Sequence, residues 1–249
     1  MTEPSAAQSP LRDPRLTERP TRSFPGFAAV VDAATKSSLA VRGSYQPDVA
    51  DELLAPLARA VGTVVLLGFT GGIQWSAFAS SDEAKDGQAD PLDRWSRRTI
   101  DGIAHGFGAT TAYPSGHPRL PFQRIAARCE PVSPSPLGLL IHPTWGLWHA
   151  YRGLLLFAER IDLPPSKVQQ SPCSVCSAKP CLTACPVDAF ASGTYDLAAC
   201  RGHVESADGA ACRELGCLAR RACPVGPEFR YGESQARFHM DSFRRSVAG

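Results

Sequence analysis

Residues 173–186 read CSVCSAKPCLTACP and place four cysteines with gaps of two, four and three residues. Residues 200–224 read CRGHVESADGAACRELGCLARRACP and place four more, with gaps of 11, four and five residues. Both runs end in Cys-Pro, where proline fixes its own φ and cannot continue a hydrogen-bond ladder. Eight of the nine cysteines of this 249-residue chain therefore gather in one short region. The pattern predicts a metal centre with these thiols as ligands.

Eight thiols divide into two sets of four, and four cysteines are the ligand number of a cubane iron–sulfur cluster. In two-cluster ferredoxins the fourth cysteine of each run binds the other cluster. Applied to this chain, that rule predicts two [4Fe-4S] clusters with crossed ligands. The first set is Cys173, Cys176, Cys181 and Cys223, and the second set is Cys185, Cys200, Cys212 and Cys217.

Three other interpretations of the cysteines stay open at the level of sequence. Structural zinc prefers pairs at short spacing. Cys173 and Cys176 form such a pair, but no second pair with a two-residue gap follows. Disulfides form in oxidising compartments and typify small secreted chains, and nothing in this sequence indicates secretion. Because both runs depart from the two-two-three spacing of bacterial ferredoxins, a single cluster on the first run is the third alternative.

Composition and charge limit the remaining functions. The net charge of +2 argues against a general nucleic-acid or acidic-membrane surface, so no nucleic-acid partner is expected. No apolar run approaches the roughly 20 residues that cross a bilayer, so no membrane insertion is expected. Residues 1–25 lack the apolar region of a secretory signal and predict a disordered leader. Free thiols without a signal predict a cytoplasmic protein.

Upstream of the cysteines, helical and strand-like patterns alternate, which predicts an α+β fold. Residues 61–69 form an almost fully apolar run, typical of a buried strand. The other predicted elements are helices over 27–34, 48–60, 92–107 and beyond 229, and strands over 39–45, 109–113, 137–142 and 150–159. The last two strands flank a turn and predict a hairpin. The expected domains are a leader over 1–25, an α/β domain over 26–165 and an iron–sulfur domain over 166–249.

Residues 139–156, LLIHPTWGLWHAYRGLLL, resemble the His-Pro-x-x-Gly-x-Trp element and Arg-Gly strand of the cobalamin-trafficking reductase-decyanase family. They are also similar to the hairpin of the epoxyqueuosine reductases and, more distantly, of the reductive dehalogenases, where it precedes a dicluster ferredoxin module. The resemblance covers about residues 120–225. It implies a nitroreductase-like α/β domain that holds a cobalamin or other corrinoid close to one cluster, followed by a small ferredoxin-like iron–sulfur module.

Four residues of this segment are candidate cofactor-binding residues: His142, Trp145, Trp148 and Arg152. His142 either lines a cofactor pocket or has a structural role. The two tryptophans either stack on a flat macrocycle or pack the core. Arg152 either binds a phosphate or carboxamide group or pairs with a carboxylate. The ninth cysteine, Cys129, is either a small buried hydrophobe or a group that faces the cofactor cavity.

The chain departs from the epoxyqueuosine reductases at their acidic proton donor. In place of that family's Val-Asp-Thr-type segment, residues 128–132 read RCEPV, so that Glu130 is the nearest acid. The helical-repeat domain that commonly follows the clusters in that family has no counterpart in this sequence. We therefore do not expect epoxyqueuosine reduction.

A bare electron carrier needs only a small ferredoxin module, whereas here a further folded domain precedes the clusters. We expect two [4Fe-4S] clusters to relay single electrons to a cofactor or substrate, with a corrinoid as the candidate, in the N-terminal domain; an enzyme of this kind would be an oxidoreductase. The expected partners are an electron donor protein or flavin reductase and a small-molecule or corrinoid ligand. The alternatives are a ferredoxin-like electron-transfer protein and a corrinoid-binding or trafficking protein without substrate turnover.

Overall fold

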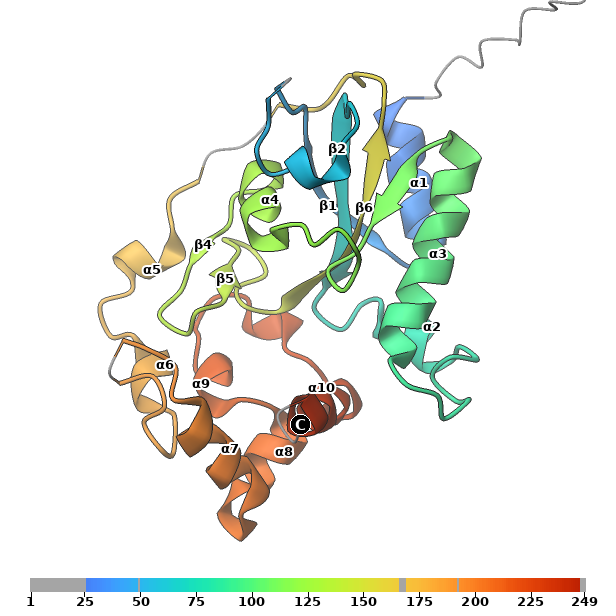
Figure 1. Ribbon diagram of the computed structural model, residues 1–249. Coiled ribbons are helices and arrows are strands. Elements are labelled where there is room, and N and C mark those ends of the chain that lie inside the picture. The colour runs from blue at the N-terminus through green and yellow to red at the C-terminus, as the bar shows by residue number, and fades with distance from the viewer. Residues whose placement is uncertain (1–25, 49, 166–168, 192, 247–249) are drawn as a thin grey trace, which may run out of the picture.

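The computed structural model describes residues 26–48, 50–165, 169–191 and 193–246. The leader expected over 1–25 lies outside the described residues, as does part of the connection into the cysteine-rich region. Figure 1 shows a sheet flanked by helices, with a group of short helices beneath it that leads to the C-terminal helix. No helix among the described residues is long and apolar enough to span a membrane.

The main sheet is antiparallel, in the strand order β1-β2-β6-β3. Its strands are β1 (Ala40–Tyr45), β2 (Thr63–Thr70), β6 (His149–Phe157) and β3 (Thr110–Ala112). All eight residues of β2 are buried, because this strand lies inside the sheet and is covered on both faces. A doubly covered strand reads as a continuous apolar run rather than an alternating one. The buried strand predicted over 61–69 is thereby confirmed.

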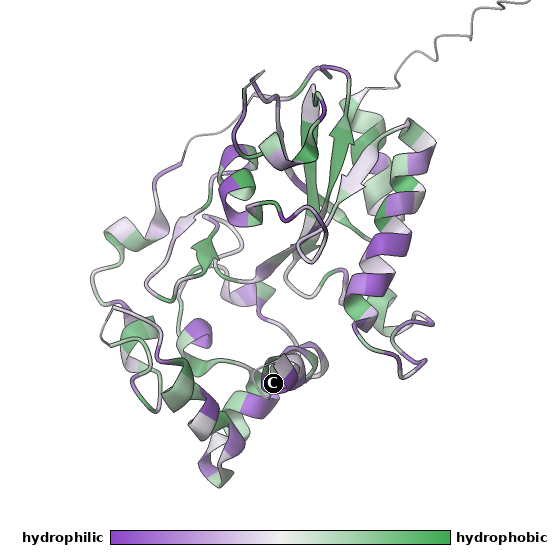
Figure 2. Cartoon of the chain, in the orientation of Figure 1, coloured by the Kyte–Doolittle hydropathy of each residue, from purple (hydrophilic) through white to green (hydrophobic). Residues whose placement is uncertain are grey.

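Each face of the sheet has its own hydrophobic core, because successive side chains of a strand point to opposite faces. The covering helices are α1 (Phe27–Lys36), α3 (Pro91–Phe107) and α4 (Phe122–Cys129). Val65 and Leu155 belong to the core under α1 and α3. Val64 and Leu154 belong to the core under α4. In Figure 2 the strands are largely green, whereas α3 also shows purple residues on its outer side. The mixed helix-and-sheet fold class is confirmed.

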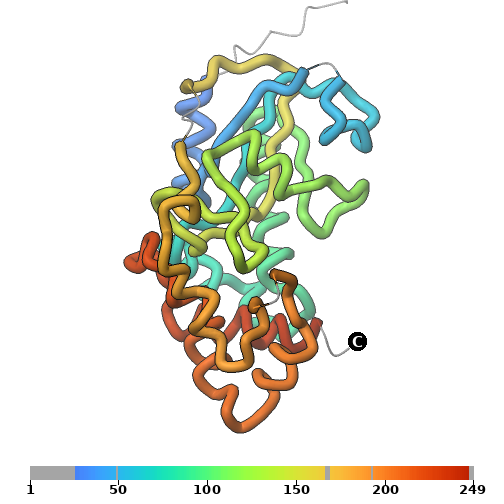
Figure 3. The backbone as a smooth tube through the Cα atoms, turned by 90° about the vertical axis from the view of Figure 1, so that its left-hand side faces the viewer, coloured from blue at the N-terminus to red at the C-terminus, as the bar shows by residue number. Residues whose placement is uncertain are grey.

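Short helices form the part of the chain that carries the cysteine runs, and Figure 3 shows this part stacked against the sheet-containing part. They are α5 (Pro172–Val175), α6 (Pro180–Thr183), α7 (Leu197–Glu205), α8 (Ala210–Leu215) and α9 (Leu218–Arg221), with 3-10 turns at Ala207–Gly209 and Pro227–Phe229. The chain then forms α10 (Glu233–Ser246), which lies against α8. The helix predicted beyond residue 229 is confirmed as α10.

Helix α10 connects the two parts of the molecule through α2 (Trp75–Ala79). Trp75 Nε1 donates a hydrogen bond to Ser234 Oγ at 3.0 Å. The Phe238 ring lies edge-on to the rings of Trp75 and Phe78, with centroids 5.3 and 5.2 Å away. An aromatic cluster therefore anchors the end of the chain to the sheet-containing part.

Two helix expectations need correction. The described residues of 48–60 form turns and the 3-10 helix Ala55–Leu57 instead of an α-helix, because Pro56 lacks the N–H that an α-helix needs there. Conversely, α4 was not predicted, although its buried residues recur at helical spacing. They are Phe122, Ile125, Ala126 and Cys129. An eight-residue helix offers only two turns of that pattern, which is too short to stand out from its proline-rich surroundings.

The expected hairpin of residues 137–142 with β6 is wrong. Residues 137–142 contain only the two-residue strand β5 (Leu140–Ile141), which pairs with β4 (Ser133–Pro134). Strand β6 pairs with β2 along one side and with β3 at residues 154–156 on the other, while β5 takes β4 as its partner. The intervening residues close a separate small turn through the bridge between His142 and Gly146.

A buried ion pair joins β1 to the end of α4. Arg42 Nη2 lies 3.0 Å from Glu130 Oε2, and the two side chains are 0% and 2% exposed. Arg42 also donates to the Phe69 carbonyl oxygen at 2.8 Å, and the Tyr151 hydroxyl donates to Glu130 at 2.8 Å. Burial raises the pKa of Glu130, while Arg42 and Tyr151 oppose that shift. Glu130, the acid nearest to the position of the family's proton donor, is therefore held inside the core.

Replacing Arg42 with Met should destabilise the protein strongly. The substitution leaves the Glu130 carboxylate buried without its counter-ion, and breaking a buried pair in this way costs about 3–5 kcal/mol. Denaturant unfolding under anaerobic conditions measures the change. Lys36→Met is the matched control, because Lys36 and Asp32 form a pair whose side chains are 74% and 62% exposed, and such pairs contribute about 0–1 kcal/mol. Equal effects of the two substitutions would contradict the structural role of the buried pair.

Candidate metal centre and adjoining cavity

The thiols of the first set lie together, although they come from distant parts of the sequence. Burial raises the pKa of Cys173, and the neighbouring thiols Cys223, Cys181 and Cys176 raise it further. Cys181 is affected in the same way by Cys223 and Cys176. All four cysteines line one small cavity, whose wall includes Ile141. The structure thus brings Cys223 from the second run to the three leading cysteines of the first run.

The thiols of the second set form a separate group. Burial raises the pKa of Cys212, and the nearby thiols of Cys200 and Cys185 raise it further. Burial acts likewise on Cys217, to which Cys200 and Cys212 add. Tyr195 lies beside this group, and burial together with a hydrogen bond to Cys200 raises its pKa. Cys185, the last cysteine of the first run, therefore lies with the cysteines of the second run.

Prolines and turns shape the cysteine runs locally. Pro172 and Pro180 occupy the first turns of α5 and α6, a position where the missing N–H has no helical partner to lose. Lys179 has a φ of 38° between these helices. It is one of the two residues by which the gap between Cys176 and Cys181 exceeds the usual spacing. The longer gap is accommodated by a left-handed residue that redirects the chain into α6.

The turn formed by residues 142–146 rests directly on the backbone that follows Cys223. Gly146 has a φ of 57°, and a Cβ there would lie 2.0 Å from the Val225 carbonyl oxygen. Gly226 has a φ of 61°, and a Cβ there would lie 2.7 Å from the Thr144 carbonyl oxygen. Only glycine fits at two such close approaches. The turn therefore fixes the chain position two residues after Cys223.

No three or more His, Cys, Asp or Glu side chains of the described residues are arranged to hold one metal ion. Four thiolates on a zinc ion would each lie about 2.3 Å from it. The thiolates of a cubane cluster bind different iron atoms, so they surround a larger volume. The two groups of four thiols fit this second arrangement in ligand number and ligand type.

A cavity lies between β6, α9 and α10. Its volume is about 390 Å³. The ring-bearing and charged residues that line it are His149, Tyr151, Arg152, Arg220, Tyr231 and His239. Its apolar wall includes Leu147, which belongs to a hydrophobic cluster that contains cysteines of both sets. The cavity therefore adjoins the cysteine-rich part of the chain through Leu147.

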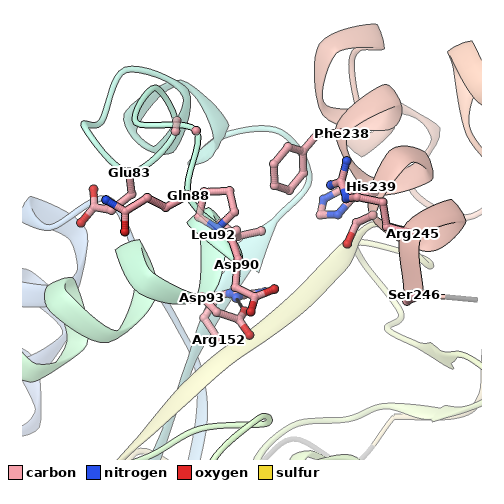
Figure 4. A pocket seen from close by; sticks show the side chains of 15 residues that line it. Glu83, Gln88, Asp90, Leu92, Asp93, Arg152, Phe238, His239, Arg245 and Ser246 are labelled. Carbon is pink, nitrogen blue, oxygen red and sulfur yellow. Dashed lines mark hydrogen bonds and ion pairs between the residues drawn. The ribbon is translucent and has the colours of Figure 1, made fainter. Parts of the chain in front are cut away.

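A second cavity of about 780 Å³ adjoins the first, because both are lined by Arg152 and His239. Figure 4 shows Arg152 and Asp93 on one side of it and Phe238, His239 and Arg245 of α10 on the other. Arg152 forms an ion pair with Asp93 and donates from Nε to Ser96 Oγ at 2.9 Å. The positive charge of Arg152 is thus matched by a carboxylate.

Two histidines of the smaller cavity are held neutral. Burial lowers the pKa of His149 to about 3, with Arg42 adding to the effect. Burial lowers the pKa of His239 to about 4, with Arg220 and Arg152 adding to it. His149 Nε2 lies 3.0 Å from the Leu140 carbonyl oxygen. Its Nδ1 and the Nε2 of His239 are buried and have no hydrogen-bond partner among the described residues.

Of the four predicted cofactor-binding residues, Arg152 is the one that lines these cavities. Trp148 is 2% exposed, with its ring centroid 5.3 Å from that of Tyr231. Trp145 lies between the His142 ring and the Arg42 guanidinium, each 4.0 Å away. His142 Nδ1 accepts a hydrogen bond from a backbone N–H of the turn at 3.0 Å. The roles of all four as cofactor ligands stay predictions.

Sequence reasoning missed Arg220, Tyr231, His149 and His239 as candidate site residues. Arg220 follows the ordinary pattern of a short basic helix, and His239 lies within a charged amphipathic one, so neither carries a local signal. His149 lies inside residues 139–156, the segment that resembles the reductase families, but nothing in the local sequence distinguishes it from its neighbours. Cys129 is buried at the end of α4, where burial and Glu130 raise the pKa of its thiol.

The chain combines a sheet and a cysteine-rich part that share a cavity, and this fold was compared with those of known proteins. No family model matches the chain, and no curated protein sequence matches it. The fold, however, is similar to that of a solved structure: a selenomethionine-labelled epoxyqueuosine reductase has a TM-score of 0.52 with 12% identity, covering 84% of this chain and 68% of that one. The chain therefore resembles the epoxyqueuosine reductases in fold, as the sequence analysis indicated.

Two further structures of the same kind are similar to the chain at lower scores. An epoxyqueuosine reductase with an epoxyqueuosine-modified tRNA-Tyr stem loop has a TM-score of 0.48 and 13% identity, covering 84% of this chain and 69% of that one. The epoxyqueuosine reductase of Streptococcus thermophilus has a TM-score of 0.45 and 13% identity, covering 80% and 65%.

The expectation that no nucleic acid is a partner is contradicted by the neighbour that holds a tRNA stem loop, and it is withdrawn. That expectation rested on the net charge of +2. Net charge reports the average long-range attraction of the surface, whereas recognition of a nucleotide depends on local contacts. A small net charge therefore does not exclude such a partner.

Replacing His239 with Gln should reduce the loss of stability at mildly acidic pH. The folded-state pKa of about 4 lies below the ordinary value of 6.5, so the unfolded chain takes up a proton first as the pH falls below 6.5. The stability that neutral His239 contributes is therefore fully present above pH 6.5 and is lost as the pH falls toward 4. Between pH 7.5 and 5.5 this group accounts for about 1 kcal/mol.

Thermal unfolding followed by circular dichroism at both pH values measures this difference. His105→Gln on α3 is the control, because His105 is exposed. The wild type and the control should lose more stability on acidification than His239→Gln. The same loss in all three proteins would show that His239 is not held neutral by the fold.

Proposed function

We propose that this chain is an iron–sulfur protein that relays single electrons through two [4Fe-4S] clusters to a ligand in the cavity between β6 and α10. The observation that carries the proposal is the sorting of eight thiols into two groups of four with crossed membership. Crossed ligands are a property of two-cluster ferredoxins. A mononuclear zinc site is not favoured, because no three His, Cys, Asp or Glu side chains of the described residues are arranged to hold one metal ion.

The position of the cavity suggests where the electrons would go. Leu147 lines the cavity, and its hydrophobic cluster contains cysteines of both sets. Electrons from a low-potential donor would therefore pass one at a time through the two clusters and leave toward the cavity. Each transfer oxidises one centre by one electron and reduces the next by one.

The chain tunes this relay by burial and hydrogen bonding. Ala189 N donates to Cys185 Sγ at 3.4 Å, and such bonds to sulfur, together with burial, set cluster potentials. Residues 26–165 would supply the ligand-holding domain and residues 166–249 the ferredoxin-like module. The contact of Gly146 with Val225 would keep the first cluster at a fixed position beside the cavity.

A corrinoid is the cofactor that the sequence resemblance suggests for the cavity, and when bound it would supply a cobalt centre that accepts electrons singly. The two joined cavities, of about 390 and 780 Å³, suit a large ring with polar substituents. Arg152, Arg220 and Tyr151 would hold such substituents, and Leu147 would cover the ring on the cluster side. The side chains present therefore fit a ligand of this class.

One observation favours the alternative of a corrinoid-binding or trafficking protein over an enzyme. None of the described residues that line the smaller cavity is an aspartate or glutamate. Glu130, the acid nearest to the position of the family's proton donor, pairs with Arg42 inside the core. A protein that only reduces and holds its ligand does not need such a donor. Turnover of a substrate by the reduced, loaded protein separates the two functions.

The thiol sets can be tested by removing one ligand of each. Wild-type protein reconstituted anaerobically should hold about eight irons per chain. Cys176→Ala and Cys212→Ala should each lose about half of that iron, because each removes a ligand of a different cluster. Cys129→Ala is the control, since that thiol belongs to neither set, and should keep the full amount.

Iron and sulfide analysis with the EPR spectrum of the reduced protein measures these changes. Spin coupling between two clusters should be present in the wild type and absent from both ligand variants. Full iron content in Cys176→Ala or Cys212→Ala would show that the ligand assignment is wrong. Visible-spectrum titrations should then cover corrinoids and, because one structural neighbour is a complex with a tRNA stem loop, tRNA stem loops as well.

A further inference from the structure

Arg220 brings a positive charge to the cavity without an acidic partner. Its Nε donates to the Leu147 carbonyl oxygen at 3.1 Å, and its guanidinium lies 4.5 Å from the Trp148 ring and 4.6 Å from the Tyr231 ring. Among the described residues it forms no ion pair with a carboxylate. The other arginine of the cavity, Arg152, pairs with Asp93. Arg220 is therefore the guanidinium whose charge is left uncompensated.

The surroundings of Arg220 strengthen this imbalance. His149 and His239 line the same cavity, and each has a buried ring nitrogen without a partner. Arg220 contributes to the lowered pKa of both histidines, which shows that its charge reaches them through the protein. No aspartate or glutamate belongs to the described lining of this cavity. The group that would balance the charge is thus missing from the cavity wall.

We propose that the smaller cavity binds a small molecule through an anionic group, a carboxylate or a phosphate, that pairs with Arg220. A partly buried charge is stabilised when an opposite charge and hydrogen bonds accompany it. The guanidinium has a planar set of donors that suits both kinds of oxyanion. The unpartnered nitrogens of His149 and His239 supply further hydrogen bonds to the same group, each as donor or acceptor according to its tautomer.

The apolar and aromatic lining of the cavity specifies the rest of the ligand. Leu139, Leu140 and Leu147 form its apolar side, and Tyr151 and Tyr231 contribute rings. A flat apolar or conjugated body would cover these side chains, with the anionic group directed toward α9 and α10. This ligand class deepens the proposed function, because the molecule that accepts electrons from the clusters would carry this charge. Its binding is independent of electron transfer and is tested separately.

Phenyl phosphate and phenol form a suitable pair of probes, since they share the ring and differ in the anion. Isothermal titration of the oxidised, reconstituted protein should show binding of phenyl phosphate and markedly weaker binding of phenol. Arg220→Met should weaken phenyl phosphate binding by about 10- to 100-fold, the value of a lost charge-assisted hydrogen bond. Arg220→Lys, which keeps the charge, should lose less. His239→Gln should weaken binding by a smaller factor than Arg220→Met.

Arg124→Met is the matched control, because Arg124 lies exposed on α4 and outside both cavities. Binding by this variant should equal that of the wild type. Since Arg220→Met also removes hydrogen bonds to Leu147, its circular dichroism and iron content are compared with those of Arg220→Lys. Should Arg220→Met fail to fold, Arg220→Lys and His239→Gln carry the test, and unchanged phenyl phosphate affinity in both would overturn the proposal.

Two further outcomes would overturn the proposal. Equal binding of phenol and phenyl phosphate would show that the cavity does not recognise an anion. A shifted cluster potential in Arg220→Met, with unchanged phenyl phosphate affinity, would show that the guanidinium balances the charge of a cluster instead. Full iron content without anion binding would reject this inference alone. Loss of iron from the wild type would reject the proposed relay, whatever the result of the titration.

Discussion

The direct contact between the backbones at Gly146 and Val225 is the constraint on which the arrangement of the molecule depends. A Cβ at Gly146 or at Gly226 would lie 2.0 or 2.7 Å from a carbonyl oxygen, so neither position can carry a side chain. The contact places a turn of the sheet-containing part against the segment that follows Cys223. A thiol of the first set is thereby held at a fixed position relative to β6, and the cavity beside β6 inherits that position.

The same turn is supported from its other side by the buried charges. Trp145 is sandwiched between the His142 ring and the Arg42 guanidinium, and Arg42 is held by Glu130. An arginine with no exposed side-chain surface needs this partner, because an unpaired buried charge is costly. Glu130 and two of the candidate cofactor-binding residues, His142 and Trp145, thus support the turn. Chemistry that needs solvent access or a bound ligand is left to the cavity at β6, α9 and α10.

The sequence predicted the elements whose physical signal is local and missed those set by the rest of the fold. The apolar run of β2 and the amphipathic pattern of α3 are signals of this kind. The hairpin failed because the neighbours of β6 are distant in sequence, which no local pattern reports. Arg220 and His239 could not be identified for a related reason. Their significance comes from meeting in one cavity, and an arginine on a short basic helix has the same local appearance with or without a ligand.

Under the proposed relay, the charge distribution would serve both the cavity and the clusters. A cluster with four thiolate ligands gains negative charge when it is reduced, and an acceptor beside it gains negative charge when the electron moves on. Arg42, Arg152 and Arg220 each contribute positive potential at His149 or His239, and the histidines stay neutral rather than adding to it. Positive potential at the acceptor favours electron arrival there over return to the cluster. Under the proposed relay, a cavity with positive potential and no carboxylate in its described lining would both hold an anionic ligand and draw an electron toward it, and Arg220 would contribute to both.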